Sequence, residues 1–303
     1  GLGCEKLTVE RLLTEEERTK ENVVILQDYV GYEAMVDALM TMAEAKLEKL
    51  NKRKRQPLPL SRLCVGMQCG GSDAFSGVSA NPVAGYASDL LVSGGATVMF
   101  SEVTEVRDGV HLLAERCSTP EALEALKAEI GWYDRYLAKG GVDRSANPTP
   151  GNKAGGLSNI VEKAMGSIVK SGRAPIAEVI GPGALPTKTG LIFAATPASD
   201  LVCGPSQVAS GIALQVFMTG RGTPYNLAEA PVVKVSSRKE MKTRWPDLID
   251  FDAGPVVVKE ESVAEAGERL FDLILEVASG KKTLAEERRL FNFLSFFNPA
   301  PMT

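Results

Sequence analysis

The sequence predicts an α/β fold in which a mostly parallel sheet is flanked by helices, with Rossmann-like layering but no dinucleotide fingerprint. Short apolar runs alternate along the chain with segments of helical periodicity, which is the pattern of strand–helix–strand units. The glycine turn at Gly70 and Gly71 lacks the G-x-G-x-x-G spacing, and no Walker lysine follows it. We therefore expect no nucleotide cofactor.

The first elements are an apolar run and a periodic segment. Val23–Leu26 predicts a buried strand. Apolar residues from Met35 to Leu50 recur at helical spacing and predict a long amphipathic helix. The basic run Asn51–Gln56 follows it without aromatic neighbours, so we expect a solvated helix end rather than a nucleic-acid surface.

Later apolar runs and cap signals predict the remaining elements. The expected strands are Leu63–Met67, Ala96–Phe100, Ile176–Ile180, Gly190–Ala195, Leu214–Met218 and Pro231–Val235. A cap residue followed by proline predicts helix starts at Asn81–Pro82 and at Thr119–Pro120, and a final helix is expected near Val263–Ser279. The Gly-, Pro- and Asn-rich segment Lys139–Gly156 is the strongest break, and we expect a loop there that divides the chain into two lobes.

Composition narrows the class of protein. The 303 residues carry 34 Lys and Arg against 38 Asp and Glu, a net charge of −4 that favours neither nucleic acid nor a membrane surface as partner. No apolar run is long enough to span a bilayer. The cysteines, Cys4, Cys64, Cys69, Cys117 and Cys203, are odd in number and lack paired spacing, so we expect a cytoplasmic protein without disulfides.

The segment VGMQCGGSDAFSG, Val65–Gly77, lies between a predicted strand and a predicted helix, where parallel sheets bind ligands. Gly70 and Gly71 let the backbone approach a ligand, and the amides toward Ser72 and Asp73 could face an anion. A tight turn beside a buried Cys69 thiol explains the same residues, and the segment alone does not choose between the two.

Acidic residues and the single histidine follow the next strand. Ser101–Leu113 contains Glu102, Glu105 and His111 just beyond the expected carboxyl edge of the sheet. Carboxylates beside an imidazole suit metal ligation or proton transfer. The alternative is a solvated loop with a surface histidine.

Two further loops carry polar groups that suit an anionic ligand. Pro150–Asn159 offers Asn152 and Lys153 ahead of a helix start, as a carboxylate cradle or as a linker between lobes. Arg221 stands between two glycines after a predicted strand, where its guanidinium could hold a carboxylate through two hydrogen bonds or stabilise the loop.

The segment Ala194–Gln207 sets Asp200 and Cys203 three residues apart, again after a predicted strand. Together with Cys4 and Cys69 they could converge on one divalent cation. No C-x-x-C spacing is present, and each cysteine alone is more often a small buried apolar residue.

Seven segments, which span essentially the whole chain, resemble the galactarate dehydratase/altronate dehydratase family. They are GLGCE, GMQCGGSDAFSGVSANP, FSEVTEV, PGNKAGGLSNIVEKA, TPASDLVCG, TGRGTPY and FNPAPMT. TPASD and FNPAP resemble the galactarate branch of the family. The resemblance implies a metal-dependent lyase that eliminates water from galactarate and gives 5-dehydro-4-deoxy-D-glucarate, with iron(II) as the expected metal. It also implies that this chain is the C-terminal catalytic region, since the family's complete chain has a small β-rich domain and a Cys/His-containing segment before GLGCE.

The resemblance and the residue types together suggest roles for the site residues. We expect metal ligation by Cys4, Cys69, Asp200 and Cys203, proton transfer by Glu102, Glu105 and His111, and substrate binding by Gly70, Gly71, Ser72, Asp73, Asn152, Lys153 and Arg221. Cys69 is expected to be a ligand or a wall of the site rather than a nucleophile, because dehydration needs no covalent enzyme intermediate.

The expected partner is an aldarate dianion, and we expect a homo-oligomer. Two alternatives stay open. One is a lyase of the same family that acts on altronate or on a related hydroxy or sulfonated acid, and the other is a fragment that binds a sugar acid or assembles without turnover.

Overall fold

The computed structural model describes residues 8–18, 22–291, 295 and 297. The chain divides into two compact units, residues 1–57 and residues 58–303, which we describe separately. Cys4, one of the predicted metal ligands, lies outside the described residues. Among the helices that the structure describes, none is long and apolar enough to cross a membrane.

The first unit is built around a helix of 20 residues, α2 (Tyr32–Asn51), which confirms the predicted long helix. A short helix, α1 (Val9–Leu12), and a 3-10 turn, η1 (Leu26–Asp28), precede it. All residues of α2 are described and none of them is buried. The basic run after α2 is exposed, as expected for a solvated helix end.

The predicted strand at Val23–Leu26 is wrong. Residues 23–25 have no regular structure, and Leu26 begins η1. A strand needs a neighbouring strand to pair its backbone groups, and the described part of this unit contains none. Val24 instead lines a groove with Ala38 of α2, which explains the apolar residues of this run without a strand.

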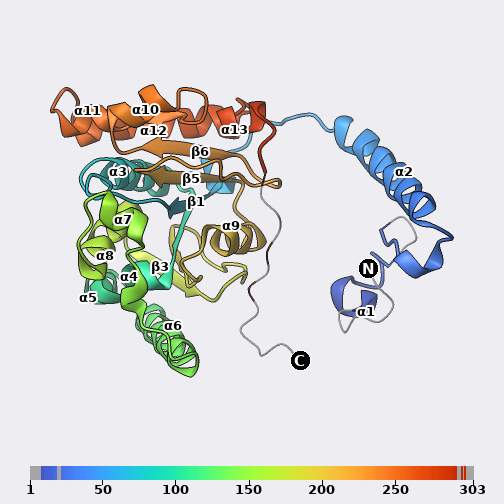
Figure 1. The fold of residues 1–303 in the computed structure, drawn as a ribbon, viewed down its shortest axis with the longest axis horizontal. Coiled ribbons are helices and arrows are strands. Elements are labelled where there is room, and N and C mark those ends of the chain that lie inside the picture. Colours follow the sequence, from blue (N-terminus) through green and yellow to red (C-terminus); the bar gives the residue numbers. More distant parts are fainter. Residues whose placement is uncertain (1–7, 19–21, 292–294, 296, 298–303) are drawn as a thin grey trace. The chain divides into compact units, whose positions relative to one another are not determined.

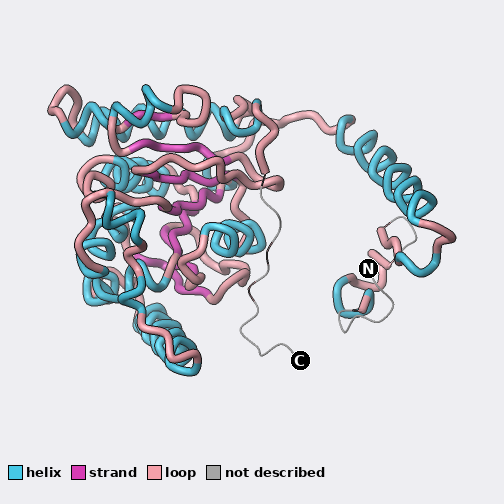
Figure 2. The backbone as a smooth tube through the Cα atoms, viewed as in Figure 1, coloured by secondary structure: helices cyan, strands magenta, loops and turns pink. Residues whose placement is uncertain are grey.

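The described residues of the second unit form one seven-stranded sheet in the order β3-β4-β2-β1-β5-β6-β7. The strands are β1 (Cys64–Cys69), β2 (Thr97–Ser101), β3 (Ile176–Ile180), β4 (Leu191–Ala194), β5 (Leu214–Thr219), β6 (Val232–Ser236) and β7 (Phe251–Asp252). Each pairing in it is parallel, and β6, β5 and β1 lie side by side in Figure 1. Figure 2 shows the strands in magenta with helices around them. The predicted α/β fold with a parallel sheet is confirmed.

The strand order has a switch point at β1. From β1 the chain moves to β2 on one side, and it later returns to place β5 on the other side of β1. In open parallel sheets, ligands bind beyond the carboxyl ends of the strands at such a point. The loops after β1, β2 and β5 therefore meet where a site is expected.

Six strands agree with the predicted runs, and β7 was not predicted. β7 has only two residues, too few for an apolar run to be noticed. Its pairing with β6 comes from tertiary context, because Phe251 is opposite Val235 in the register.

Helices cover both faces of the sheet. They include α3 (Ala80–Ser93), α4 (Val103–Val106), α5 (Val110–Ala114), α6 (Pro120–Lys139), α7 (Pro150–Ala154), α8 (Ile160–Ile168), α9 (Asp200–Ala209), α10 (Lys239–Arg244), α11 (Gly254–Val257), α12 (Val263–Ala278) and α13 (Leu284–Glu287). Short 3-10 turns are η2 (Leu60–Arg62), η3 (Arg107–Gly109), η4 (Arg144–Ala146) and η5 (Val169–Ser171). The predicted final helix is confirmed by α12.

The two predicted cap-proline starts differ in outcome. Thr119 accepts a hydrogen bond from Ala122 N–H at 3.3 Å and Pro120 begins α6, as predicted. The start of α3 lies two residues earlier than predicted, because Ser79 is the cap residue and Asn81 already lies inside the helix.

The main core lies between one face of the sheet and α3, α6 and α12. Val65 and Met67 of β1 pack with Leu91 of α3 and Leu270 of α12 in this core. Strand residues alternate between faces, so Gly66 and Gln68 point to the opposite face, which α9 covers. A Cβ on Gly66 would lie 2.3 Å from the Gln207 side chain, so glycine is needed for α9 to pack this closely.

The segment Lys139–Gly156 lies within the second unit and contains η4 and α7. It is attached to the loop after β1, because Asn152 Nδ2 donates a hydrogen bond of 2.9 Å to Ser72 O. This contact places the segment beside the carboxyl edge of the sheet.

Candidate active site

A thiol and a carboxyl group meet where β1 and β2 end. Cys69 is the last residue of β1, and Glu102 directly follows β2. Met67 pairs with Phe100, so Cys69 and Glu102, two residues further on, lie level with each other. Glu102 has φ 82° and ψ 81°, a left-handed conformation that costs an L-residue about 1–3 kcal/mol and persists where surrounding contacts fix it.

One helical face brings two lysines to this edge. Lys163 and Ser167 lie on α8, and Lys170 lies on η5, which continues directly from α8. Spacings of four and three residues place these side chains on the same face of a helix. α8 packs against α4, which carries Glu105, so the lysines meet the carboxyl groups.

The Lys170 ammonium lies at the centre of the cluster. Its side chain is fully buried, and Nζ lies 3.3 Å from Cys69 Sγ, 3.2 Å from Glu102 Oε2 and 2.8 Å from Ser167 Oγ. An ammonium has three N–H donors, and three acceptors surround it here. Lys170 is therefore satisfied as a buried cation.

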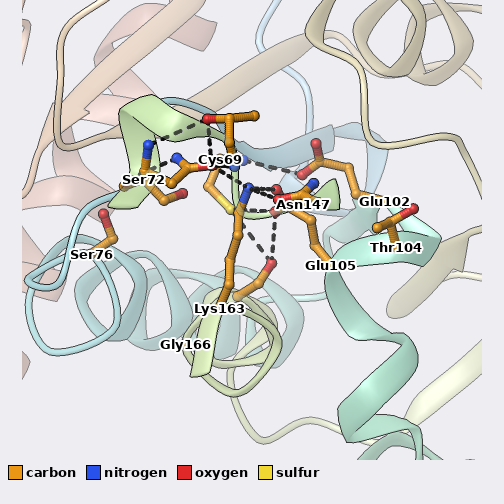
Figure 3. A network of polar contacts seen from close by, with 12 residues as sticks. Cys69, Ser72, Ser76, Glu102, Thr104, Glu105, Asn147, Lys163 and Gly166 are labelled. Carbon is orange, nitrogen blue, oxygen red and sulfur yellow. Dashed lines mark hydrogen bonds and ion pairs between the residues drawn. The ribbon is translucent and has the colours of Figure 1, made fainter. Parts of the chain in front are cut away.

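The Glu105 carboxylate is held by three donors (Figure 3). Lys163 Nζ lies 2.6 Å from Oε1, and Oε2 accepts hydrogen bonds from Ser167 Oγ at 3.2 Å and from Cys69 Sγ at 3.1 Å. Glu105 is buried, so these contacts replace the water that a carboxylate requires.

The two glutamates differ in protonation. Burial, the charge of Glu105 and the charge of Asp200 raise the pKa of Glu102 to about 8, against the opposing effect of Lys170. Burial alone would also raise the pKa of Glu105, but Lys163 and Lys170 outweigh it and hold that pKa below its ordinary value. At neutral pH, Glu102 is therefore a neutral acid and Glu105 an anion.

The Cys69 side chain is a thiol rather than a thiolate. Burial and the charge of Glu105 raise its pKa to about 12, although Lys170 opposes the rise. Nucleophilic cysteines have lowered pKa values. The Cys69 thiol therefore lacks the lowered pKa of a nucleophilic cysteine, and its role stays a prediction.

Asp200 begins α9 and faces the loop after β1. Gln68 Nε2 donates to its Oδ1 at 3.0 Å. A Cβ on Gly70 would lie 2.7 Å from the same oxygen, so a glycine at position 70 allows this approach. Burial and the charge of Glu105 raise the pKa of Asp200 to about 6, which leaves it ionised at neutral pH.

A cavity of about 200 Å³ opens beside the cluster. Seven polar residues line it: Ser72, Asp73, Ser76, Asn81, Glu162, Lys163 and Ser167. Lys163 and Ser167 line the cavity and also contact Glu105, so the cavity adjoins the cluster. Glu102, Glu105 and Asp200 are not among the residues that line it.

The structure brings several predicted residues together and gives some of them structural contacts. Glu102, Glu105 and Cys69 form the cluster. Asp73 is bound by the Ser237 hydroxyl at 3.0 Å and by Arg238 Nε at 2.9 Å, contacts that fix the loop after β1.

Other predicted residues lie near the cluster without joining it. Asn152 Oδ1 lies 3.3 Å from Lys163 Nζ, and Gly71, with φ 61°, allows the turn between Gly70 and Ser72. Cys203 is buried one turn along α9 from Asp200, and burial raises the pKa of its thiol well above the ordinary value.

Three predicted residues have exposed side chains away from this cluster. They are His111 on α5, Lys153 on α7 and Arg221 after β5. Of the described interactions of the cluster, none involves His111. Their predicted roles stay predictions.

Lys163, Ser167 and Lys170 were not among the site residues predicted from the sequence. A signal was present, because the three polar residues recur at positions i, i+4 and i+7 among apolar neighbours. Such spacing normally indicates a solvated face, and only the packing of α8 on α4 shows that this face is buried.

Comparison with protein families matches residues 60–300 to the family described as D-galactarate/altronate dehydratase, C-terminal. The chain belongs to this family. The match covers the sheet, the lysine-bearing helix and the acidic cluster, and it agrees with the resemblance that the sequence segments indicated.

Similar curated proteins come from several bacteria. The chain is 58% identical over 312 residues to "Galactarate dehydratase (L-threo-forming)" of Escherichia coli (strain K12), covering 100% of this chain and 60% of that relative. It is 33% identical to "Altronate dehydratase" of Bacillus subtilis (strain 168), covering 98% of the chain and 59% of the relative. It is 35% identical to "(2R)-sulfolactate sulfo-lyase subunit beta" of Chromohalobacter salexigens, covering 77% of the chain and 61% of the relative. The chain thus spans about 60% of the length of these relatives.

The resemblance to the family implies a divalent metal, and the acidic cluster is where it would first be sought. One ligand atom each from Cys69, Glu102 and Glu105 lies within 4.8 Å of the others. However, Lys170 Nζ lies within 3.9 Å of the same three groups and supplies the positive charge there. A second cation bound by these groups would be repelled by the ammonium, so the cluster does not fit a resident cation while Lys170 is in place. The iron expected from the resemblance stays a prediction.

Proposed function

We propose that this protein is a hydro-lyase that removes water from galactarate and gives 5-dehydro-4-deoxy-D-glucarate. Family membership and 58% identity to a galactarate dehydratase support the reaction class and the substrate. The observation that carries the proposal is the buried pair Glu102 and Glu105, whose pKa values are driven apart beside two lysines. Environments that separate the pKa values of neighbouring carboxyl groups are typical of acid–base sites.

The reaction needs a proton acceptor, a proton donor and stabilisation of negative charge. The hydrogen α to a carboxylate is weakly acidic, and hydroxide is a poor leaving group, so both proton transfers must be assisted. In our proposal Glu102, neutral below a pKa of about 8, protonates the departing hydroxyl. The Lys170 ammonium, 3.2 Å from Glu102, stabilises the carboxylate that this transfer leaves behind.

We assign the base role to Asp200. It is ionised at neutral pH, its charge raises the pKa of Glu102, and it is less deeply buried than Glu102 and Glu105. Glu105 has its oxygens occupied by Lys163, Ser167 and Cys69, so we assign it a positioning role that holds the two lysines.

The test is release of a 2-keto acid by the purified, complete natural protein from a panel of acids. The panel contains galactarate, altronate and (2R)-sulfolactate, which correspond to the names of the three relatives. We expect galactarate to have the highest kcat/KM, because the galactarate dehydratase is the most similar of the three. A higher kcat/KM for altronate or sulfolactate would contradict galactarate as the substrate and support the lyase class. No product from any of the three acids would contradict both the substrate and the lyase class.

A cytoplasmic location is also part of the proposal. Among the described residues, Cys64, Cys69, Cys117 and Cys203 are free thiols, which is in keeping with a reducing compartment.

A further inference from the structure

Asn81, which lines the cavity beside the acidic cluster, has a buried acceptor that no described residue satisfies. Asn81, in the first turn of α3, lines this cavity and is only 2% exposed. Its Nδ2 donates to Gly166 O at 2.8 Å, which fixes the orientation of the amide. Its Oδ1 has no hydrogen-bond donor among the residues that the structure describes. A buried carbonyl is unfavourable without a donor, so a ligand that donates a hydrogen bond would stabilise this arrangement.

The charged groups around the cavity are already paired. Lys163 Nζ contacts Glu105, Asn147 and Asn152, which occupy its three donors. Asp73 is held by Ser76, Ser237 and Arg238. Glu162, which also lines the cavity, accepts hydrogen bonds from the Ser158 N–H at 2.8 Å and the Ser158 hydroxyl at 2.6 Å. Among the described residues that line the cavity, none offers a free cation for a carboxylate. The cavity therefore suits a neutral group that forms hydrogen bonds.

We propose that this cavity binds the hydroxyl-bearing carbons of the substrate and that Asn81 Oδ1 accepts a hydrogen bond from one substrate hydroxyl. This inference rests on the proposed function, and it names the part of a sugar acid that the cavity recognises. A site built to bind a hydroxyl rejects an analogue that lacks it, because the buried acceptor is then left without a donor. Asn81 is thus a specificity residue that favours diacids with hydroxyl groups over diacids without them.

The test compares galactarate with hexanedioate, the six-carbon diacid without hydroxyls. Equilibrium affinities are measured by titration calorimetry in the complete protein carrying Glu102→Gln, which slows the conversion of bound galactarate, and the product is assayed after each titration. We expect this background to bind galactarate at least about tenfold more tightly than hexanedioate, in line with the discrimination that buried hydrogen-bonding groups provide. Adding Asn81→Leu should weaken galactarate binding about tenfold and leave hexanedioate binding unchanged.

Asn226 provides a matched control. It is also buried, its Nδ2 also donates to a backbone carbonyl, that of Leu290, and its Oδ1 also has no described donor. It does not line this cavity. Asn226→Leu should therefore leave the galactarate preference intact, which separates recognition from general effects of removing a buried amide.

The outcomes distinguish this inference from the proposed function. Wild-type protein could form no keto acid while the Glu102→Gln variant binds galactarate selectively through Asn81. The proposed function would then be wrong, and the assignment of the cavity would stand. If Asn81→Leu keeps the full preference for galactarate, or if neither diacid binds, the cavity assignment is overturned. Should Asn81→Leu not fold by circular dichroism, Asn81→Ser replaces it, since serine is well tolerated in a first helical turn and withdraws the acceptor from the cavity.

Discussion

Glu102 combines an unfavourable backbone conformation with a buried, neutral carboxyl group. Its left-handed φ of 82° follows immediately after β2, and its side chain is 1% exposed. Strained residues that persist in a fold are concentrated at functional sites. In our account the strain directs the carboxyl group toward Cys69 and Lys170 rather than toward solvent.

The raised pKa of Glu102 makes stability depend on pH. Burial raises it from the ordinary value of 4.5 to about 8, so its contribution to stability is fully present below 4.5 and is lost as the pH rises through 8. We predict that the unfolding midpoint in urea decreases across this range in wild type and that Glu102→Gln flattens the decrease. Parallel curves for wild type and variant would show that Glu102 is not the titrating group.

Lys170 is the buried cation at the centre of the cluster. Lys170→Met removes the positive charge that faces the buried Glu105 carboxylate, 3.9 Å from Nζ, and we expect a loss of roughly 3–5 kcal/mol in the free energy of unfolding. Lys127→Met removes an exposed pair with Glu124 and should cost about 0–1 kcal/mol. Equal stabilities of the two lysine variants would contradict the buried-cation assignment.

The residues of the cluster differ in how far the sequence could predict them. Cys69, Glu102 and Glu105 follow strands, and that position alone drew attention to them. Lys163 and Lys170 lie within and just after a helix whose polar spacing is equally compatible with a solvated surface. His111 was predicted for its rarity, yet it lies exposed on α5, because rarity carries no information about position.

At the level of elements, the contact between α3 and η5 positions Lys170. A Cβ on Gly85 of α3 would lie 2.1 Å from Val169 O, the residue before Lys170. These two elements therefore approach each other through a glycine, and the position of the ammonium depends on that approach.

Gly85→Ala should force η5 away from α3. We expect a loss of about 1–3 kcal/mol in stability, as for other overpacked core positions, together with reduced turnover of galactarate. Gly131→Ala on α6 is the control, because its Cβ would meet only Arg135 Nη1, at 3.3 Å, the end of a flexible side chain. That variant should be up to about 1 kcal/mol more stable, since alanine favours helix. A stable, fully active Gly85→Ala would rule out this tight packing.

Apolar runs predicted strands well where a neighbouring strand was available. The run at Val23–Leu26 has the same composition but has no described strand beside it, so it remains irregular. β7 shows the reverse, because two residues join the sheet through pairing with β6 rather than through their own pattern. Local pattern predicts the tendency to form a strand, and the partner decides the result.

At the level of the whole chain, strand order decides which loops meet. β5 follows β4 in the sequence but lies beside β1 in the sheet. The sequence could predict polar loops after strands, but it could not predict that Glu102 would face Cys69 while Arg221 remained exposed. Which of these side chains meet depends on the order of the strands in the sheet, and the periodicity of the sequence does not encode that order.

The most direct measurement is the turnover of galactarate by the complete protein carrying Glu102→Gln, beside Glu129→Gln. Glu129 on α6 is a half-buried carboxyl whose pKa burial also raises, and it lies outside the cluster. We predict that kcat for Glu102→Gln falls by about 10²–10⁴, as for loss of a general acid, with little change in KM. Glu129→Gln should keep wild-type kinetics. A folded Glu102→Gln that retains the wild-type kcat would contradict the assignment of Glu102 as the proton donor.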